Sequence, residues 1–134
     1  MIKTHRRTID LRSQKGQSLT EFALALPILV LLLFAVIQFG IVFNNYVTLT
    51  DATRAGARKA AVGRQQSNPQ NAVITAVRNS ASDLKQSDLS ITVTSTWQPG
   101  ADVTVTATYP YSIRLLGLPV KSGRLSSKTT ERVE

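Results

Sequence analysis

The chain has 134 residues, of which 43% are hydrophobic and 18% charged, a balance that excludes a wholly disordered protein and allows one small domain with an appendage. It has no cysteine, which excludes disulfides, thiolate metal sites and cysteine nucleophiles. Its formal charge of +8 makes nucleic-acid binding the first function to weigh.

A basic segment stands directly before the most apolar part of the chain. Residues 1–16 carry five Lys or Arg and one acid, and residues 17–134 carry eleven and seven. Residues 22–43 contain no charge and would form a helix of about 33 Å, enough to cross a hydrocarbon core of about 30 Å. A signal-peptide core is shorter, and a soluble core helix shows a polar face. We therefore predict a transmembrane helix over residues 17–43, with its basic N-terminal side in the cytoplasm.

Residues 44–63 turn polar without a helix breaker until Gly63, which predicts that the helix continues outward as an amphipathic stem. On a helical wheel one face of this stem is small and apolar, and it can pack on the chain's own domain or on the helix of a neighbouring subunit. The face consists of Leu49, Ala52, Gly56 and Ala60, opposite Asp51, Arg54 and Arg58.

Residues 64–134 predict a small α+β domain. Asn68 followed by Pro69 is typical of a helix start, and an apolar stripe continues this helix over residues 69–84. Alternation of apolar and Thr or Ser residues then predicts strands over residues 89–97 and 103–113, joined at a turn into an antiparallel hairpin. Pro110 should end the second strand or lie at a sheet edge. A loop through residues 117–123 leads to a possible third strand, 125–133.

Residues suited to catalysis are scarce. His5 stands alone in the basic segment, Asp83 and Asp88 flank a turn, and the glycine spacing matches no phosphate-binding loop. Nucleic-acid binding needs basic residues interleaved with aromatic ones, and the basic segment has no aromatic residue. We predict a protein that is not an enzyme, with no catalytic residue, cofactor, metal or nucleic-acid partner.

One acid stands where a plain membrane anchor needs none. Glu21 directly precedes the apolar run and follows Gly16 by five residues. It could form a capping box with Ser18 at a helix start. The pattern Gly16, four residues, Glu21, Phe22, behind a basic leader, also resembles the class III signal of type IV prepilins.

That resemblance implies that a prepilin peptidase cuts between Gly16 and Gln17 on the cytoplasmic side, removing a leader of residues 1–16. A residue without a Cβ suits an extended backbone in a peptidase cleft. Glu21 would become the fifth mature residue, and its carboxylate would pair with the new amine of a neighbouring subunit, because an unpaired charge is costly in a bundle of apolar helices.

Residues 14–62 are similar to the TadE family, the minor pilins or pseudopilins of tight-adherence (Tad) type IV pili. The similarity includes Leu26-Pro27 and the stem sequence ATRAGAR. It implies a pilin-like fold and a single-pass protein of the bacterial inner membrane, with its C-terminal domain extracytoplasmic or at the cell surface. The implied partners are the prepilin peptidase, other pilins and pseudopilins, the inner-membrane assembly machinery and membrane lipid. The alternative is an uncleaved anchor that presents a small extracytoplasmic binding domain.

Five positions along the long helix are candidates for helix packing: Pro27, Gln38, Ala52, Gly56 and Ala60. Pro27 can kink a membrane helix or be tolerated in it. Gln38 can form a hydrogen bond across helices or lie near the outer membrane interface, and we expect the interface.

Overall fold

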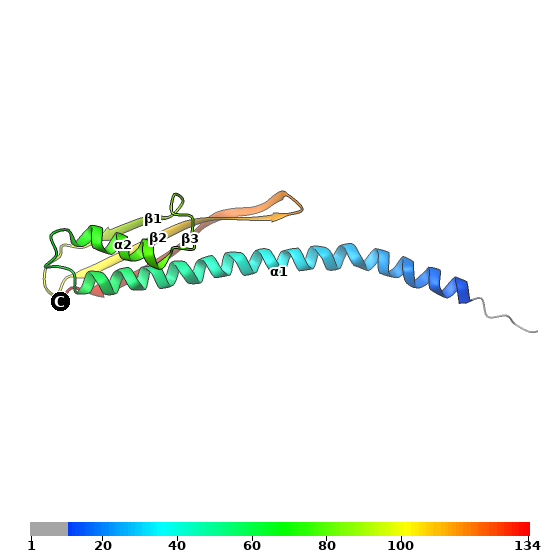
Figure 1. The fold of residues 1–134 in the computed structure, drawn as a ribbon, viewed down its shortest axis with the longest axis horizontal. Coiled ribbons are helices and arrows are strands. Elements are labelled where there is room, and N and C mark those ends of the chain that lie inside the picture. Colours follow the sequence, from blue (N-terminus) through cyan, green and yellow to red (C-terminus); the bar gives the residue numbers. More distant parts are fainter. Residues whose placement is uncertain (1–10) are drawn as a thin grey trace, which may run out of the picture. The chain divides into compact units, whose positions relative to one another are not determined.

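The computed structural model describes residues 11–134, with side chains from residue 16 onward. This part of the chain contains two helices and three strands, and Figure 1 shows them in sequence colours. It divides into two compact units that meet within the first helix, one ending at Val36 and the other being Ile37–Glu134. The combination of a long N-terminal helix, a second helix and an antiparallel sheet confirms the predicted α+β, pilin-like fold class. The elements are α1 (Leu11–Ala61), α2 (Pro69–Ser80), β1 (Ser90–Thr94), β2 (Asp102–Leu115) and β3 (Leu118–Arg132).

Helix α1 is continuous from the predicted leader through the apolar run and the stem. It begins at Leu11 and not near residue 17, so the capping box of Ser18 and Glu21 is wrong, because both residues lie beyond the first helical turn. The helix ends at Ala61, and the Gly63 amide donates to the Ala60 carbonyl at 3.1 Å. Most of the predicted leader, including His5, lies outside the described residues.

Helix α2 begins as its sequence indicates. The Asn68 side chain accepts a hydrogen bond of 3.0 Å from the Asn71 amide, with Pro69 as the first helical residue. The helix ends at Ser80 and not at Leu84 as predicted. The Gln86 side chain donates to the carbonyl of Ala81 at 2.7 Å and so satisfies a group that a longer helix would have paired. Leu84 is buried even though it is outside the helix.

The three strands form one antiparallel sheet in the order β1-β2-β3. Strand β1 pairs with β2 only from Ser90 with Thr108 to Thr94 with Thr104, whereas β3 pairs along the whole length of β2. Pro110 does not end β2. Because β1 stops at the level of Thr108, this part of β2 is an edge on its β1 side, which is where a residue without an N–H is tolerated.

The β2–β3 hairpin is longer than predicted, and no loop occupies residues 117–123. Strand β3 already begins at Leu118, paired with Leu115. Between them Leu116 and Gly117 have φ values of 51° and 85°, the positive values that both central residues of a type I′ hairpin turn require. The hairpin therefore extends past β1 as a two-stranded ribbon, which Figure 1 shows in orange.

The core lies between the stem part of α1, helix α2 and one face of the sheet. The small apolar face of the stem is buried there, and Gly56 is its closest point of approach. A Cβ added to Gly56 would collide with Cγ2 of Val77 in α2 and lie 3.3 Å from Cγ1 of Val105 in β2. Of the two partners that the sequence left open for this face, the chain's own domain covers it. The core side chains include Leu49, Ala52, Ala57, Ala60, Val73, Val77, Val103, Val105, Ala107 and Val133.

A buried polar cluster connects α1 to β3. The hydroxyl of Thr53, which has no exposed surface, donates to the Thr50 carbonyl at 2.8 Å, lies 3.0 Å from Ser127 Oγ and accepts from Thr129 Oγ1 at 3.1 Å. Farther along, the Glu134 amide donates to the Ala61 carbonyl at 2.9 Å. Because a buried hydroxyl without a partner is costly, this cluster fixes how far β3 can slide along the stem.

Candidate processing and assembly site

The residues of the predicted signal lie on the first turns of α1, before the apolar run. Gln17 and Glu21 are four positions apart and so share one side of the helix. The Gln17 side-chain amide donates to Glu21 Oε1 at 3.1 Å. Both side chains are exposed, so the carboxylate keeps oxygen lone pairs open to a partner outside this chain.

The peptide bond between Gly16 and Gln17 is helical in this structure. Its carbonyl, that of Gly16, accepts a hydrogen bond of 3.0 Å from the Thr20 hydroxyl. Cleavage of this bond in an extended conformation would require the first turns of α1 to unwind. Glycine in a helix interior is about 1 kcal/mol less favourable than alanine, which makes this position an easy one to unwind.

Nothing in the fold requires glycine at position 16. A Cβ built there meets no atom within 4 Å, and its φ is outside the positive range in which L side chains are strained. Gly56 is the opposite case, since the packing of α2 and β2 leaves no room for a side chain there. The described fold therefore gives no reason for a glycine at position 16.

The part of α1 that follows Glu21 has the character of a membrane span. Within the described residues one helical stretch, Gly16–Ala61, is long and apolar enough to cross a bilayer, and its most apolar window is not buried at all. Large apolar side chains such as Leu24, Ile28 and Phe39 are exposed around it. In water this surface would be strongly unfavourable, so these features fit a single-pass membrane protein.

Residues 16–58 match the TadE-like protein family. The match begins at Gly16, includes Gln17 and Glu21, and ends within the stem, and it confirms the resemblance drawn from the sequence. No curated protein and no solved structure matches the chain.

Two further candidate residues lie in the middle of the TadE-like segment. Pro27 is inside α1, which remains helical on both sides of it. Gln38 is half-buried, unlike its exposed neighbours Ile37 and Phe39. Gln38 lies four residues before Val42 and seven before Asn45, which are also half-buried, and Asn45 is four residues before the buried Leu49. These spacings place Gln38 on the same side of α1 as the buried face of the stem. Ala52, Gly56 and Ala60 are all in the core of the domain.

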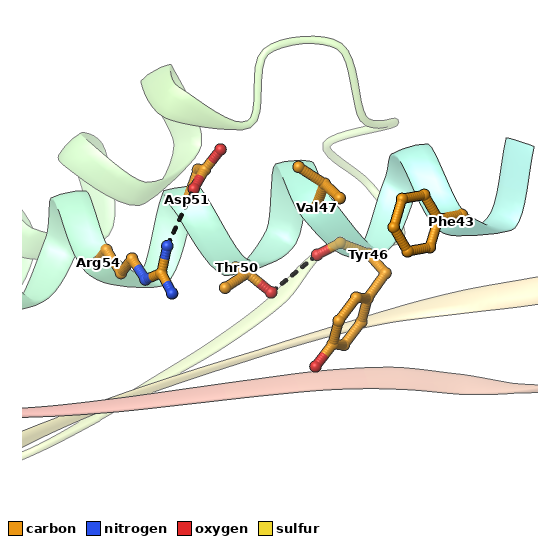
Figure 2. A pocket seen from close by; sticks show the side chains of 6 residues that line it. All are labelled: Phe43, Tyr46, Val47, Thr50, Asp51 and Arg54. Atoms are coloured by element: carbon orange, nitrogen blue, oxygen red, sulfur yellow. Dashed lines mark hydrogen bonds and ion pairs between the residues drawn. The ribbon is translucent and has the colours of Figure 1, made fainter. Parts of the chain in front are cut away.

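Another part of the TadE-like segment carries a shallow hollow that the sequence analysis missed. Its residues come from α1 alone, apolar at one end and charged at the other, and Figure 2 shows them. Thr50 donates to the Tyr46 carbonyl at 2.9 Å, and Arg54 lies 3.6 Å from Asp51. A tyrosine between apolar and charged residues is typical of the membrane–water interface, and the i, i+3 and i+4 spacing could have shown it. The hollow is lined by Phe43, Tyr46, Val47, Thr50, Asp51 and Arg54.

Proposed function

We propose that this chain is a minor pilin, or pseudopilin, that a prepilin peptidase cleaves between Gly16 and Gln17 and that takes part in assembling a Tad pilus for surface adhesion. The observation that carries the proposal is Gly16. It opens the TadE-like match, five residues before Glu21, at a position where the fold itself has room for any side chain.

In this proposal the chain crosses the bacterial inner membrane once. The positively charged leader stays in the cytoplasm, where the peptidase acts, and the α+β domain lies on the extracytoplasmic side. Five of the chain's Lys and Arg are in residues 1–16. Much of the net positive charge therefore orients the chain in the membrane and is removed when the leader is cleaved. The mature protein has no enzymatic activity, and its partners are other pilins, pseudopilins, the inner-membrane assembly machinery and lipid.

Cleavage creates a positive charge close to Glu21. The new amine of Gln17 lies one helical turn from the Glu21 carboxylate, and in the intact chain the Gln17 side chain already reaches Glu21. In a bundle of mature subunits the amine of one helix pairs with Glu21 of its neighbour. Breaking such a pair leaves a single charge in an apolar bundle, which typically costs about 3–5 kcal/mol.

The N-terminus of the protein extracted from membranes tests the proposal. Intact mass and N-terminal sequencing should show a chain that starts at Gln17 in a host with an active prepilin peptidase, and the full-length chain in a host without one. An uncleaved anchor predicts the full-length chain in both hosts, and that result would falsify the proposal.

Replacing Glu21 with alanine should leave cleavage intact and abolish or strongly impair surface attachment, because the new amine loses its partner. Glu21→Gln keeps the size and the hydrogen-bonding oxygen but not the charge, and it should fail in the same way. The measurements are the mass of the mature chain and surface attachment by cells that carry each variant. Unchanged attachment by both variants would remove the assembly role of Glu21.

A further inference from the structure

The sheet has a second face, which the core does not use. Successive side chains of a strand point to opposite faces. Val105 lies in the core and Ser127 contacts Thr53 of α1, so the odd-numbered residues here face the helices and the even-numbered residues face away from them. On β1 the same alternation leaves Thr92 exposed beside Ile91, which packs against the core.

The outward residues form an array of three rows that cross all three strands, which we call the hydroxyl face. It consists of the even-numbered residues of 90–94, 104–108 and 126–130, and the register places one residue of each strand in each row. Eight of these nine residues are Ser or Thr, and the ninth is Lys128. Neighbouring strands are about 4.8 Å apart and alternate residues of one strand about 6.7 Å apart, so the hydroxyls repeat in both directions.

Most hydroxyls of this face are open to a ligand. Thr104 Oγ1 lies 3.0 Å from Thr130 Oγ1, and Thr108 Oγ1 accepts a hydrogen bond of 3.2 Å from Arg124. Within residues 16–134 the other hydroxyls of the face form no hydrogen bond to the protein. A hydroxyl can donate once and accept twice, so the face presents donors and acceptors in a regular pattern.

Two cations stand along the β3 side of the hydroxyl face. Arg124 and Lys128 are both exposed and lie four residues apart, about 13 Å along the strand. Neither forms an ion pair with an acid of the described residues, and no Asp or Glu occurs in residues 103–130. The next outward pair, Asp102 and Arg132, lies 3.9 Å apart and is neutral as a whole. The face is therefore positively charged and complements an anionic partner.

The composition of the face selects among anionic partners. It has no aromatic and no large apolar side chain. It therefore lacks the buried anchors of a protein interface, the residues that stack on nucleic-acid bases and the side chains that enter a lipid surface. A polysaccharide with carboxylate groups needs none of these, because its hydroxyls can pair with the Ser and Thr side chains and its carboxylates with the cations.

We propose that the hydroxyl face binds an acidic polysaccharide, with its carboxylates on Arg124 and Lys128 and its sugar hydroxyls on the Ser and Thr side chains. The two cations follow β3, so the polymer runs along that strand. The proposal names a target class for the surface adhesion of the proposed function and rests on that function for its biological use. The binding itself requires neither cleavage nor pilus assembly.

The experiment measures binding of the full-length chain in detergent to immobilised polygalacturonate, a polymer of uronic acid, by biolayer interferometry. All variants come from a host without prepilin peptidase, so they carry the same basic leader. Lys128→Gln and Arg124→Gln should each weaken binding about two- to fivefold, the effect of losing an exposed ion pair.

Lys121→Gln is the matched control for the two cations. It removes the same charge from the same strand, but Lys121 is odd-numbered and pairs with Ile113, which places it on the opposite side of the sheet. Its affinity should equal that of the parent chain. Equal losses for Lys121→Gln and Lys128→Gln would overturn the proposal, because binding would then follow net charge and not the hydroxyl face.

The hydroxyls are tested by Thr106→Val, which keeps the β-branched shape at the centre of the face and removes one hydroxyl. It should weaken binding to polygalacturonate about two- to tenfold, the effect of losing a hydrogen bond. Thr50→Val is the control, since Thr50 lies on α1 and its hydroxyl bonds to the Tyr46 carbonyl, and it should bind as the parent chain does. Unchanged binding by Thr106→Val would remove the role of the hydroxyls.

Two other polymers separate this proposal from general attraction to charge or to sugar. Polyacrylate has carboxylates without sugar rings, so Thr106→Val should leave its binding unchanged, and an equal loss for both anionic polymers would overturn the proposal. Uncharged dextran bound as tightly as polygalacturonate would do the same. If polygalacturonate does not bind although the protein from a host with the peptidase begins at Gln17, this inference fails alone and the proposed function stands.

Discussion

Replacing Gly16 with tryptophan should abolish the short, mature form of this protein and make the full-length chain accumulate in the membrane. The structure makes this a clean test, because a Cβ at position 16 meets nothing within 4 Å and the helix can accept a larger side chain there. A loss of processing then reports on the peptidase cleft and not on misfolding. Intact mass of the membrane-extracted chain measures the result.

Gly40→Trp is the matched control for this substitution. Gly40 lies on the same helix, and a Cβ there also meets nothing within 4 Å, so the variant should be processed as the parent chain is. If Gly16→Trp still gave a chain that begins at Gln17, the cleavage site would be misassigned.

Replacing Gly56 with leucine should prevent the α+β domain from folding stably. At this position even a methyl group collides with Val77 and crowds Val105, and overpacking by a few methylenes typically costs about 1–3 kcal/mol. Leucine adds more volume than that at a point where α1, α2 and β2 meet. Small domains are stable by only about 5–15 kcal/mol, so we expect a large fall in the urea midpoint or loss of the folded state.

Trp97 reports this change without any label. It is the only tryptophan, half-buried against the core, and its emission in a urea titration of the full-length chain in detergent follows the domain and not the membrane helix. Gly40→Leu is the control and should leave the midpoint in place. The same midpoint for Gly56→Leu and the parent chain would contradict the packing of α2 against the stem.

The two glycines of the TadE-like match differ in the room that the fold leaves around them. Gly16 and Gly56 lie 40 residues apart within the same TadE-like match. A Cβ added to the first meets no atom within 4 Å, and the second lies at the closest contact between α1 and the rest of the domain. Substitutions at the two positions should therefore separate, with Gly16→Trp changing processing alone and Gly56→Leu changing folding.

The elements that depend on local chemistry could be predicted from the sequence. A proline after Asn68 marks the start of α2, and alternation of Val and Thr marks the strands, because capping and side-chain periodicity act over a few residues. The Gly16 and Glu21 pattern is also local in the sequence, and cleavage beside it stays a prediction. Helical periodicity also identified the small apolar face of the stem. It could not identify α2 and the sheet as the elements that cover this face.

The features that were wrong depend on which groups pair with each other, at separations from five residues upward. Helix α2 stops at Ser80 because Gln86 folds back onto the Ala81 carbonyl. The hairpin turn uses Leu116 at positive φ, a conformation that an aliphatic side chain disfavours and that no sequence rule assigns to leucine. Of the two alternatives for Pro110, β2 continues through it at a sheet edge, because β1 is short there. In each case the pairing partner decides the outcome, and the local sequence does not name the partner.

The attachment of β3 to α1 also determines how the domain responds to mechanical load. The Thr53 cluster and the bond from Glu134 to Ala61 are eight residues apart on α1, about 12 Å along its axis. Chain direction is the same in both elements, since Ser127 lies beside Thr53 and Glu134 beside Ala61. Tension applied along α1 pulls on these attachments simultaneously, in shear, and cannot peel them apart one after another as it would at the open end of a hairpin.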